Sequence, residues 1–536
     1  MVVSNRIKTL AVIFHVITIV IGFFIAWDFI ADDSFITFRY SKHLGEGNGI
    51  VFNATDIDPV EGYTNFLWMI VMAVPHALGW NPVLFSKIVG FFNFAGCALT
   101  LFLYARYKTK DGYFGYLAVL PLLILPSTYF HTVSGMETLL YSFMLLLLFS
   151  SGYELLTQSK LPSRWQIISV PVLILMAGMI RPEGILSGSI VLIVLFLSTK
   201  NHSRKNSLLY SGALLVVPGL VYFIWRVSYF GWLLPNTFYV KYGQPSDGIE
   251  WLLKSLSSVV GLIAIIILSY AFDKKGNKKS HKRFMYYAAF LIMAISPYIM
   301  SDLGMNCMNR FLFHILPVIF LIAAFEIRAL FTLGNSSKDK IATSKGLMLV
   351  VILFSLLPLL HKDKTQVAHM TLYESHLQNA HIELAKTLKS SSVPQKLRTL
   401  AVGDAGAIPY YSEWQSYDFV GLNDEFTAHN PTKKTAYLKE KAPTVLILYA
   451  EDNKNIRLDQ YGLEPHALMP EYNEIAFIKL FPNYYLAVFL RKDIDSSIYD
   501  ELFTAINTVE LKADHLNADT HNRIGLIKHL KKRIGL

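Results

Sequence analysis

Apolar blocks follow one another from residue 8 to residue 361, and most are long enough to cross a lipid bilayer. A transmembrane helix needs about 20 predominantly apolar residues, because the hydrocarbon core of a membrane is about 30 Å thick. Only 16% of the 536 residues are charged, whereas soluble proteins carry about 25%, and the mean hydropathy is +0.39. The pattern predicts a polytopic α-helical membrane protein. About eleven spans are expected, at roughly 8–30, 83–105, 113–131, 136–156, 166–180, 184–199, 207–228, 251–272, 284–300, 311–331 and 346–361.

Two apolar stretches need separate interpretation. The first, Leu10 to Ile30, is too long for the apolar part of a signal peptide and lacks a small-residue cleavage site, so we expect a spanning anchor. The second, Phe66 to Leu78, is apolar but short. We expect it to form an interfacial or re-entrant helix that does not cross the membrane.

Basic residues are concentrated in alternate loops, which predicts the topology by the positive-inside rule. With the N-terminus in the cytoplasm, the opposite loops carry few basic residues, mainly Arg39, Lys42, Lys241 and Arg310. If 66–78 were a span, every later loop would change sides and the Lys-rich loops would face outward, against this rule. The basic loops also account for most of the net charge of +10, so no nucleic-acid partner is needed to explain it. The inward-facing basic residues are Arg106, Lys108, Lys110, Lys160, Arg164, Lys200, Arg204, Lys205, Lys274, Lys275, Lys278, Lys279, Lys282, Arg283, Lys338, Lys340 and Lys345.

The composition changes to that of a soluble domain after residue 361. Helices are expected at 372–390 and 433–441, and strands at 398–402, 417–420, 444–449, 475–480 and 484–490. This order predicts an α/β or α+β domain over 362–536, after a transmembrane domain over 1–361. An odd number of spans places the C-terminal domain outside the cytoplasm, on the same side as the first outer loop, 31–82.

Unusual polar residues also collect on that outer side. They are Asp32, Asp33, Glu61, Asn65, His131, Glu137, Arg181, Glu183, Asn236, Lys241, Asp302, Asn306 and Arg310. A transporter or lipid flippase, the main alternative, would place ionisable residues near the bilayer midplane, between broken helices. The centres of the expected spans carry none, so we expect a site on the outer membrane surface.

Asp32 and Asp33 lie directly where the first apolar block ends. One aspartate is enough to cap a short helix that begins near Ser34 and ends near Gly45. A second carboxylate at the lipid boundary carries a desolvation cost, which favours a function. Partial burial raises the pKa of a carboxyl group toward the range of a general base. The sequence does not distinguish between the two aspartates.

Three basic residues lie in separate outer loops, at Arg181, Lys241 and Arg310. Each has an ordinary interpretation as an interfacial side chain, with Arg181 pairing with Glu183 and Arg310 with Asp302. Guanidinium and ammonium groups also bind phosphate. Their shared side of the membrane favours a lipid-linked phosphate as the ligand.

Other candidate motifs are less informative. Glu137, at the end of an outer turn that begins with His131, is expected to cap the next span. The turn from Gly403 to Gly406, which contains Asp404, lacks a dinucleotide fingerprint, so nucleotide binding is excluded. Neither the two cysteines nor the other residues show metal-ligand spacing.

Several of these motifs together resemble one subgroup of the GT-C glycosyltransferases, which includes the mycobacterial terminal β-(1→2) arabinofuranosyltransferase. The resemblance covers residues from about 10 to about 430; its first motif, Asp32 to Tyr40, is specific, and Arg181 to Gly184 is less so. In the region 302–309 the chain departs from the family's Gly/Asp-rich turn, so arabinose is not carried over. The motifs are Asp32 to Tyr40, Gly47 to Asn53, Glu61 to Trp68, Pro235 to Lys241, Gly403 to Ser412 and Gly421 to Asp424.

The resemblance implies an inverting transferase of the bacterial inner membrane. It would move a sugar from a polyprenyl-phosphate donor to an envelope glycan, glycolipid or glycoprotein. An acid in the first outer loop, Asp33 or Asp32, would be the base, and Arg181, Lys241 and Arg310 would bind the donor phosphate. No cofactor is required, because polyprenyl phosphate is already a leaving group; a divalent metal stays an alternative that the residues do not indicate. Further substrate contacts are expected from Glu61, Tyr63, Asn65, His131, Glu137, Asn236, Asp302 and Asp404.

Two further alternatives share parts of this expectation. A polymerase or protein glycosyltransferase of the same class would differ only in its acceptor. A non-enzymatic envelope assembly protein would use the two aspartates as helix caps alone.

Overall fold

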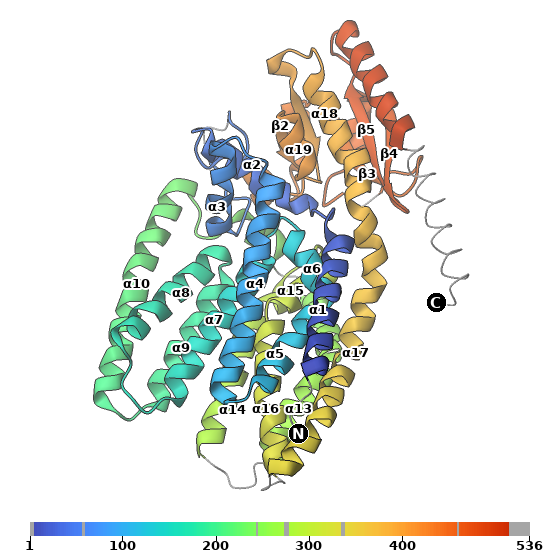
Figure 1. The fold of residues 1–536 in the computed structure, drawn as a ribbon. Helices are drawn as coiled ribbons and strands as arrows, with labels where there is room; N and C mark the ends of the chain where they lie inside the picture. Colours follow the sequence, from blue (N-terminus) through green and yellow to red (C-terminus); the bar gives the residue numbers. More distant parts are fainter. Residues whose placement is uncertain are drawn as a thin grey trace, which may run out of the picture.

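A computed structural model describes residues 5–55, 59–242, 245–272, 278–333, 338–457 and 460–513. Figure 1 shows a bundle of long helices with a smaller sheet domain at one end, and the helix α17 (Lys338–Leu377) connects the two parts. The N-terminus lies toward the opposite end of the bundle. Two parts of the sequence prediction, Lys274 with Lys275 and the last part of the C-terminal domain from 514, lie outside the described residues.

Every expected span coincides with a helix or with a bent pair of helices. Five helices of the described residues are long and apolar enough to cross a membrane, or up to 8 if each bent pair counts as one span. The structure thus agrees with a multi-pass membrane protein but does not confirm eleven spans. Besides α17, the bundle contains α1 (Asn5–Ala26), α4 (Pro82–Thr109), α5 (Gly112–Ile124), α6 (Pro126–Val133), α7 (Thr138–Thr157), α8 (Arg164–Ile180), α9 (Glu183–Ser198), α10 (His202–Phe230), α12 (Pro245–Ser258), α13 (Val260–Phe272), α14 (Lys278–Ile295) and α16 (Leu316–Leu333).

Three of the expected spans are broken, which the apolar pattern did not predict. Helices α5 and α6 meet at 67° and α12 and α13 at 71°, and a third bend of 59° precedes α16. Pro126 explains the first bend, because a proline disfavours helical geometry in the residue before it. No proline stands at the break before Val260.

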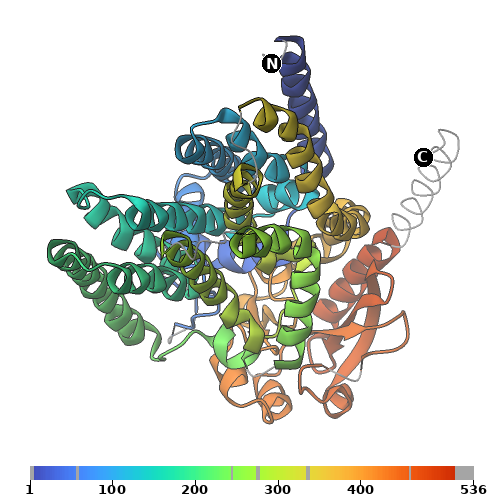
Figure 2. The ribbon, with the colours of Figure 1, turned by 90° about the horizontal axis from the view of Figure 1, so that it is seen from below.

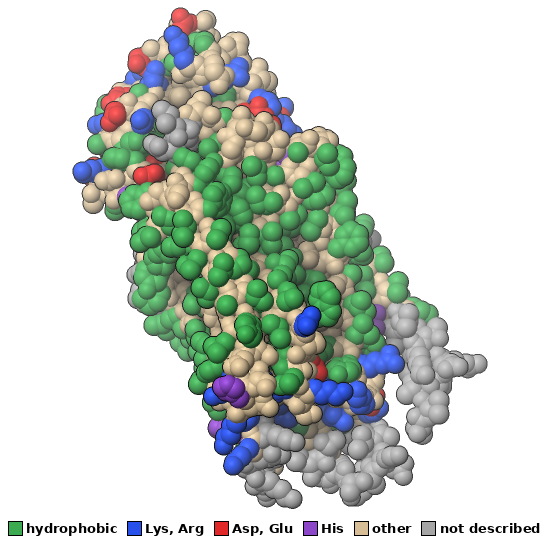
Figure 3. All heavy atoms as spheres, turned by 90° about the vertical axis from the view of Figure 1, so that its left-hand side faces the viewer, with side chains coloured by type: hydrophobic (Ala, Val, Ile, Leu, Met, Phe, Trp, Pro, Cys, Tyr) green, Lys and Arg blue, Asp and Glu red, His purple; other side chains and the backbone are tan. Residues whose placement is uncertain are grey.

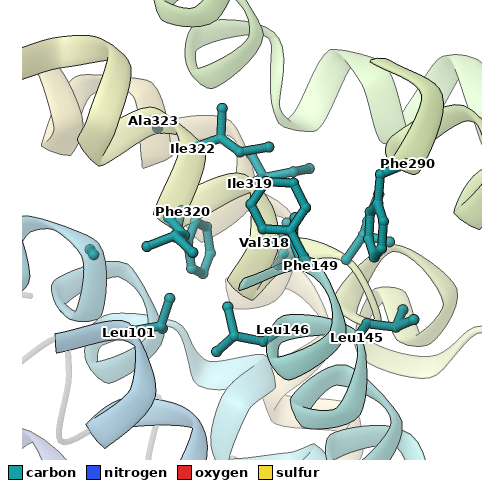
Figure 4. Close-up of a cluster of buried hydrophobic side chains, with 14 of the residues drawn as sticks. Leu101, Leu145, Leu146, Phe149, Phe290, Val318, Ile319, Phe320, Ile322 and Ala323 are labelled. Atoms are coloured by element: carbon teal, nitrogen blue, oxygen red, sulfur yellow. The ribbon is translucent and has the colours of Figure 1, made fainter. Parts of the chain in front are cut away.

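Helix α16 lies at the centre of the bundle. Its residues from Val318 to Ala324 are all buried, as expected for a helix that is hydrophobic on every side. Figure 4 shows these side chains packed against leucines of α4 and α7 and against Phe149 and Phe290. Glu326, two residues beyond this segment, pairs with Arg283 of α14 at 3.0 Å.

The expected inward-facing basic loops meet at one end of the bundle. Lys108 pairs with Glu154 at 2.6 Å and Lys345 with Asp111 at 2.8 Å. Lys282 donates to the carbonyl of Ser198 at 2.6 Å. In Figure 3, Lys and Arg gather at this lower end, a broad hydrophobic surface follows, and charged side chains return on the sheet domain. Seen from the basic end, α8 to α10 and the strands of the sheet domain lie on opposite sides (Figure 2).

The C-terminal domain contains one mixed sheet in the order β2-β1-β3-β5-β4, with β1 parallel to β2 and β3 and the other pairs antiparallel. The central strand β3 is buried at every position, which its continuous apolar sequence predicts. The strands are β1 (Thr399–Val402), β2 (Gln415–Asp418), β3 (Val445–Ala450), β4 (Tyr472–Phe481) and β5 (Tyr484–Arg491).

Helices of this domain depart from the expectation in two places. The expected helix 372–390 is the end of α17, a π-helical turn η3 (Gln378–Ile382) and α18 (Glu383–Ser390), and α17 runs through residue 361 without a break. A helix over 496–513 was not expected. Shorter helices are α19 (Ala407–Ser412), α20 (Glu425–His429), α21 (Lys434–Lys441) and α22 (Pro465–Leu468).

Segment 31–82, the expected first outer loop, forms two helices at the end of the bundle where the sheet domain lies (Figure 1). Helix α2 (Asp32–Gly45) ends where the sequence predicted, and α3 (Phe66–Ala77) has 12 residues. A helix of that length reaches about 18 Å at 1.5 Å per residue, which is too short for the hydrocarbon core of a membrane.

Candidate functional site

A cavity of about 540 Å³ is lined by residues from one end of the bundle, from segment 31–82 and from the sheet domain. Its wall brings together many of the residues that the sequence singled out, from α2, α11 (Asn236–Lys241), α15 (Arg310–Phe313), the turn before α7 and the turn between α8 and α9. Leu422 of the sheet domain closes one side. The expected site residues in the wall are Asp33, Tyr63, Asn65, Glu137, Arg181, Lys241, Asp302 and Arg310.

The two aspartates of α2 point to different places. Asp33, Ile36 and Thr37 share a helix face and line the cavity. Asp32 is 8% exposed and is not part of this wall, and its Oδ1 accepts a hydrogen bond from the backbone N–H of Ala407 at 2.8 Å. Adjacent residues of a helix point about 100° apart, so only one of the two faces the cavity.

Neither aspartate caps α2. The N-cap is Ala31, and no side chain makes a capping hydrogen bond there. The carboxylate of Asp33 is half-buried and makes no hydrogen bond or ion pair with another residue that the structure describes. Burial raises the pKa of Asp32 to about 7, and His381, which lowers it, only partly opposes this effect.

Glu137 is the centre of a buried ion-pair network. Its carboxylate accepts from Arg181 at 2.7 Å, from Arg310 at 2.8 Å and from Asn65 at 2.9 Å. Burial alone would raise the pKa of Glu137, but Arg310 and Arg181 outweigh it and hold the pKa at about 2. Glu137 stands at the N-cap position of α7 but makes no capping hydrogen bond, so the expected capping role was wrong.

The basic residues of the wall differ in their pairing. Arg181 also pairs with Glu183 at 2.5 Å, as expected. Arg310 pairs with Glu137 and not with Asp302, whose carboxylate instead accepts from the N–H of Gly304 at 2.9 Å. Among the described residues, no carboxylate forms an ion pair with Lys241. Lys241 is therefore a cation of the wall without a carboxylate partner in this part of the chain.

The remaining expected residues surround the cavity without lining it. Glu61 pairs with Arg226 of α10 at 2.5 Å, and its burial raises its pKa although Arg226 opposes the change. Asn236 reaches the carbonyl of Gly421 at 3.5 Å. The ring of His131 bonds the carbonyl of Met308 at 3.0 Å.

Asp404 lies behind the cavity, in the sheet domain. It accepts hydrogen bonds from Tyr484 at 2.8 and 2.9 Å and pairs with His381 at 2.7 Å. Asp404 therefore supports the structure around the cavity and does not face it.

The two residues directly before Arg310 have left-handed backbone geometry. Met308 has a φ of 50° and Asn309 a φ of 55°, which is uncommon outside glycine. The N–H of Met308 donates to Gln366 of α17 at 2.6 Å. Gln366 could not be recognised from the sequence, because a polar residue on a long helix gives no sign of a partner in another loop.

Metal ligands are not clustered in the part of the chain that the structure describes. It contains no group of three or more His, Cys, Asp or Glu side chains that could hold a metal ion. The sequence-based expectation about cofactors stays a prediction.

Comparison with solved structures finds the same arrangement of a helical bundle and a C-terminal sheet domain elsewhere. ArnT from Cupriavidus metallidurans bound to undecaprenyl phosphate is similar with a TM-score of 0.58 at 12% identity, covering 92% of this chain and 99% of that chain. The apo state of the same ArnT gives 0.54 at 12% identity, covering 90% and 98%.

More distant comparisons add less. The oligosaccharyltransferase of Archaeoglobus fulgidus gives a TM-score of 0.48 at 12% identity, covering 87% of this chain and 72% of that chain. A family model described as a domain of unknown function, DUF8728, matches residues 366–502. The comparison with curated proteins gave no match. The similarity to ArnT establishes the fold, whereas the narrower resemblance to the arabinofuranosyltransferase group stays a prediction.

Proposed function

We propose that this protein is an inverting glycosyltransferase that moves a sugar from a polyprenyl-phosphate donor to an envelope glycan, glycolipid or glycoprotein. The observation that carries the proposal is the cavity wall itself. It combines Asp33, a carboxylate without a partner among the described residues, with Lys241, an ammonium without a carboxylate partner there. Chemistry of this kind needs a base for the acceptor and a cation for the phosphate.

Asp33 is the general base in this proposal. It takes the proton of an acceptor hydroxyl while the hydroxyl oxygen attacks the anomeric carbon of the donor sugar. The bond between that carbon and the phosphate oxygen breaks, and polyprenyl phosphate leaves with the electron pair. A single displacement inverts the anomeric centre. The helix face of Asp33, and the burial of Asp32 against Ala407, favour Asp33 over Asp32 for this role.

Lys241 is the main phosphate contact. Arg181 and Arg310 already pair with Glu137, so their charges are largely compensated. Each guanidinium has five N–H donors, of which these pairs use only some, so both can still donate to phosphate oxygens. We therefore rank Lys241 above the two arginines for the strength of donor binding.

The cavity also has an apolar side, which favours a lipid-linked donor over a soluble nucleotide sugar. Five of its lining residues are exposed apolar side chains that belong to the bundle end and to the loops above it. A polyprenyl chain in the bilayer can lie against such a surface without exposing its own apolar area to water. These residues are Leu186, Leu234, Phe238, Tyr242 and Met300.

The membrane orientation belongs to the same proposal. The basic loops lie at the end of the bundle opposite the cavity, which by the positive-inside rule is the cytoplasmic end. The cavity and the sheet domain then face the outside of the bacterial inner membrane. A flippase, the alternative, would move the lipid across the bilayer without changing it.

Donor turnover by the purified protein in nanodiscs tests this function. We expect the polyprenyl-phosphate donor to lose its sugar and an envelope acceptor to gain it. Mass spectrometry of the donor and the acceptor detects this transfer. Asp33→Asn is expected to lower the transfer rate by about 10²- to 10⁴-fold while donor binding persists. The exposed Asp500→Asn serves as the control. Normal transfer by Asp33→Asn would refute the assigned base, and lipid movement without turnover would favour the flippase.

A further inference from the structure

Helix α2 is fastened to the sheet domain along the face that does not line the cavity. Asp32 accepts from Ala407, and Arg39 donates to the carbonyls of Pro409 and Trp414, the latter at 2.9 Å. Asp32 and Arg39 are seven residues apart, which is close to two helical turns, so they lie on one face. One turn further, Lys42 pairs with Glu413.

At Asp32 the backbone of the sheet domain approaches helix α2 closely. A Cβ atom on Gly406 would lie 2.3 Å from the backbone oxygen of Asp32 and 2.4 Å from its Oδ2. Only glycine fits there without a shift of the first turn of α2. The backbone of 406–407 thus packs directly on the residue that precedes Asp33.

A buried polar network holds this turn of the sheet domain in place. Asp404, two residues before Gly406, accepts hydrogen bonds from Tyr484 of β5 and from Tyr449 of β3, the latter at 3.3 Å. His381, which pairs with Asp404, lies in the π-helical turn η3, where the long helix leaves the bundle. Such π-helical turns occur frequently at functional sites. The turn is therefore tied both to the sheet and to the helix that comes from the membrane.

We propose that Asp32 is a positioning residue, which through Ala407 fixes the first turn of α2 to the sheet domain and so aims the Asp33 carboxylate into the cavity. This inference rests on the function proposed above. In this proposal the C-terminal domain holds the base Asp33 in place and does not contact the reacting atoms. A catalytic group that is misplaced by about 1 Å can lower the rate about 100-fold. The effect of losing this contact on the rate is therefore large enough to measure.

The variant Asp32→Asn distinguishes a positioning role of residue 32 from a role as a proton acceptor. Its amide oxygen can still accept from Ala407, but it cannot take up a proton. Burial raises the pKa of Asp32 to about 7, so a neutral side chain is close to the state that the site already tolerates. Alanine at the same position removes the hydrogen bond altogether.

The experiment compares the steady-state kinetics of the purified full-length variants in nanodiscs with a polyprenyl-phosphate sugar as donor. We expect Asp32→Ala and Gly406→Ala to lower kcat by about 10- to 100-fold with the donor KM within about twofold. Asp32→Asn should recover most of this loss. Gly212→Ala is the matched control, because a Cβ there meets nothing within 4 Å.

The outcomes separate the two proposals. Equal losses in Asp32→Asn and Asp32→Ala would mean that the charge of Asp32 is itself required, which overturns positioning. An unchanged kcat in Asp32→Ala would overturn it as well, even if Gly406→Ala did not fold. Asp33→Asn is measured in the same assay. A normal rate in that variant refutes the proposed base whatever Asp32 does, whereas an inactive Asp33→Asn beside a normal Asp32→Ala refutes only the positioning role.

Discussion

Replacing Glu137 by Gln removes a charge from a carboxylate that is 1% exposed and bonded to three side chains. The pKa of Glu137 is about 2 in the folded protein, against an ordinary value of 4.5. That difference corresponds to about 3 kcal/mol of folding free energy. Breaking a buried ion pair by removing one partner costs about 3–5 kcal/mol, so two independent routes give a similar magnitude.

The sign of the pH dependence follows from the direction of the shift. Because folding lowers the pKa of Glu137, its stabilisation is fully present above about pH 4.5 and is lost as the pH falls toward 2. Glu137→Gln lacks the stabilisation at every pH. The difference in unfolding free energy between the two proteins is therefore expected to be largest at neutral pH and to shrink on acidification below about pH 4.5.

Unfolding of the purified protein in mixed micelles, titrated with SDS and followed by tryptophan fluorescence, measures this difference. The control is Glu250→Gln, which breaks an exposed pair with Lys254 and is expected to leave the midpoint unchanged. A loss below about 1 kcal/mol in Glu137→Gln at pH 7 would contradict the reasoning, because the two arginines would then be satisfied without the carboxylate.

Three further predictions concern the donor, the topology and the packing of the bundle. Lys241→Ala is expected to weaken donor binding about tenfold or more, because a charge-assisted contact is worth about 1.5–3 kcal/mol; unchanged affinity in a lipid-binding titration would make Lys241 an interfacial anchor. Protease added to intact spheroplasts should remove the chain after about residue 362, and a protected C-terminus would reverse the proposed orientation. Gly90→Ala should destabilise the bundle in the SDS titration by about 1–3 kcal/mol, since its Cβ would lie 1.9 Å from the carbonyl oxygen of Thr132; a value as small as that of Gly212→Ala would show that α4 can move aside.

The bundle and the central strands could be predicted from the sequence because they depend on local properties. Long apolar blocks indicate where helices lie, and the continuous apolar run of β3 indicates a buried strand. The alternation of basic loops is also local, and the structure gathers those loops at one end. The break between α12 and α13, at 71°, could not be predicted in this way, because no proline marks it.

The candidate site could be predicted from the sequence only in part, for a different reason. The residue types, and the side of the membrane predicted for them, singled out Asp33, Lys241 and Arg310, which line one cavity. Whether a basic residue is free or paired depends on which carboxylate approaches it in space. Glu137 was therefore misread as a cap, although it compensates two arginines.

Tertiary structure alone distinguished the two adjacent aspartates. Both stand in the first turn of α2, and their sequence context is the same. Helical geometry forces them about 100° apart, but it does not say which one turns toward the cavity. That is decided by the contact of Asp32 with Ala407, 375 residues away in the sequence, because only the folded chain brings the two segments together.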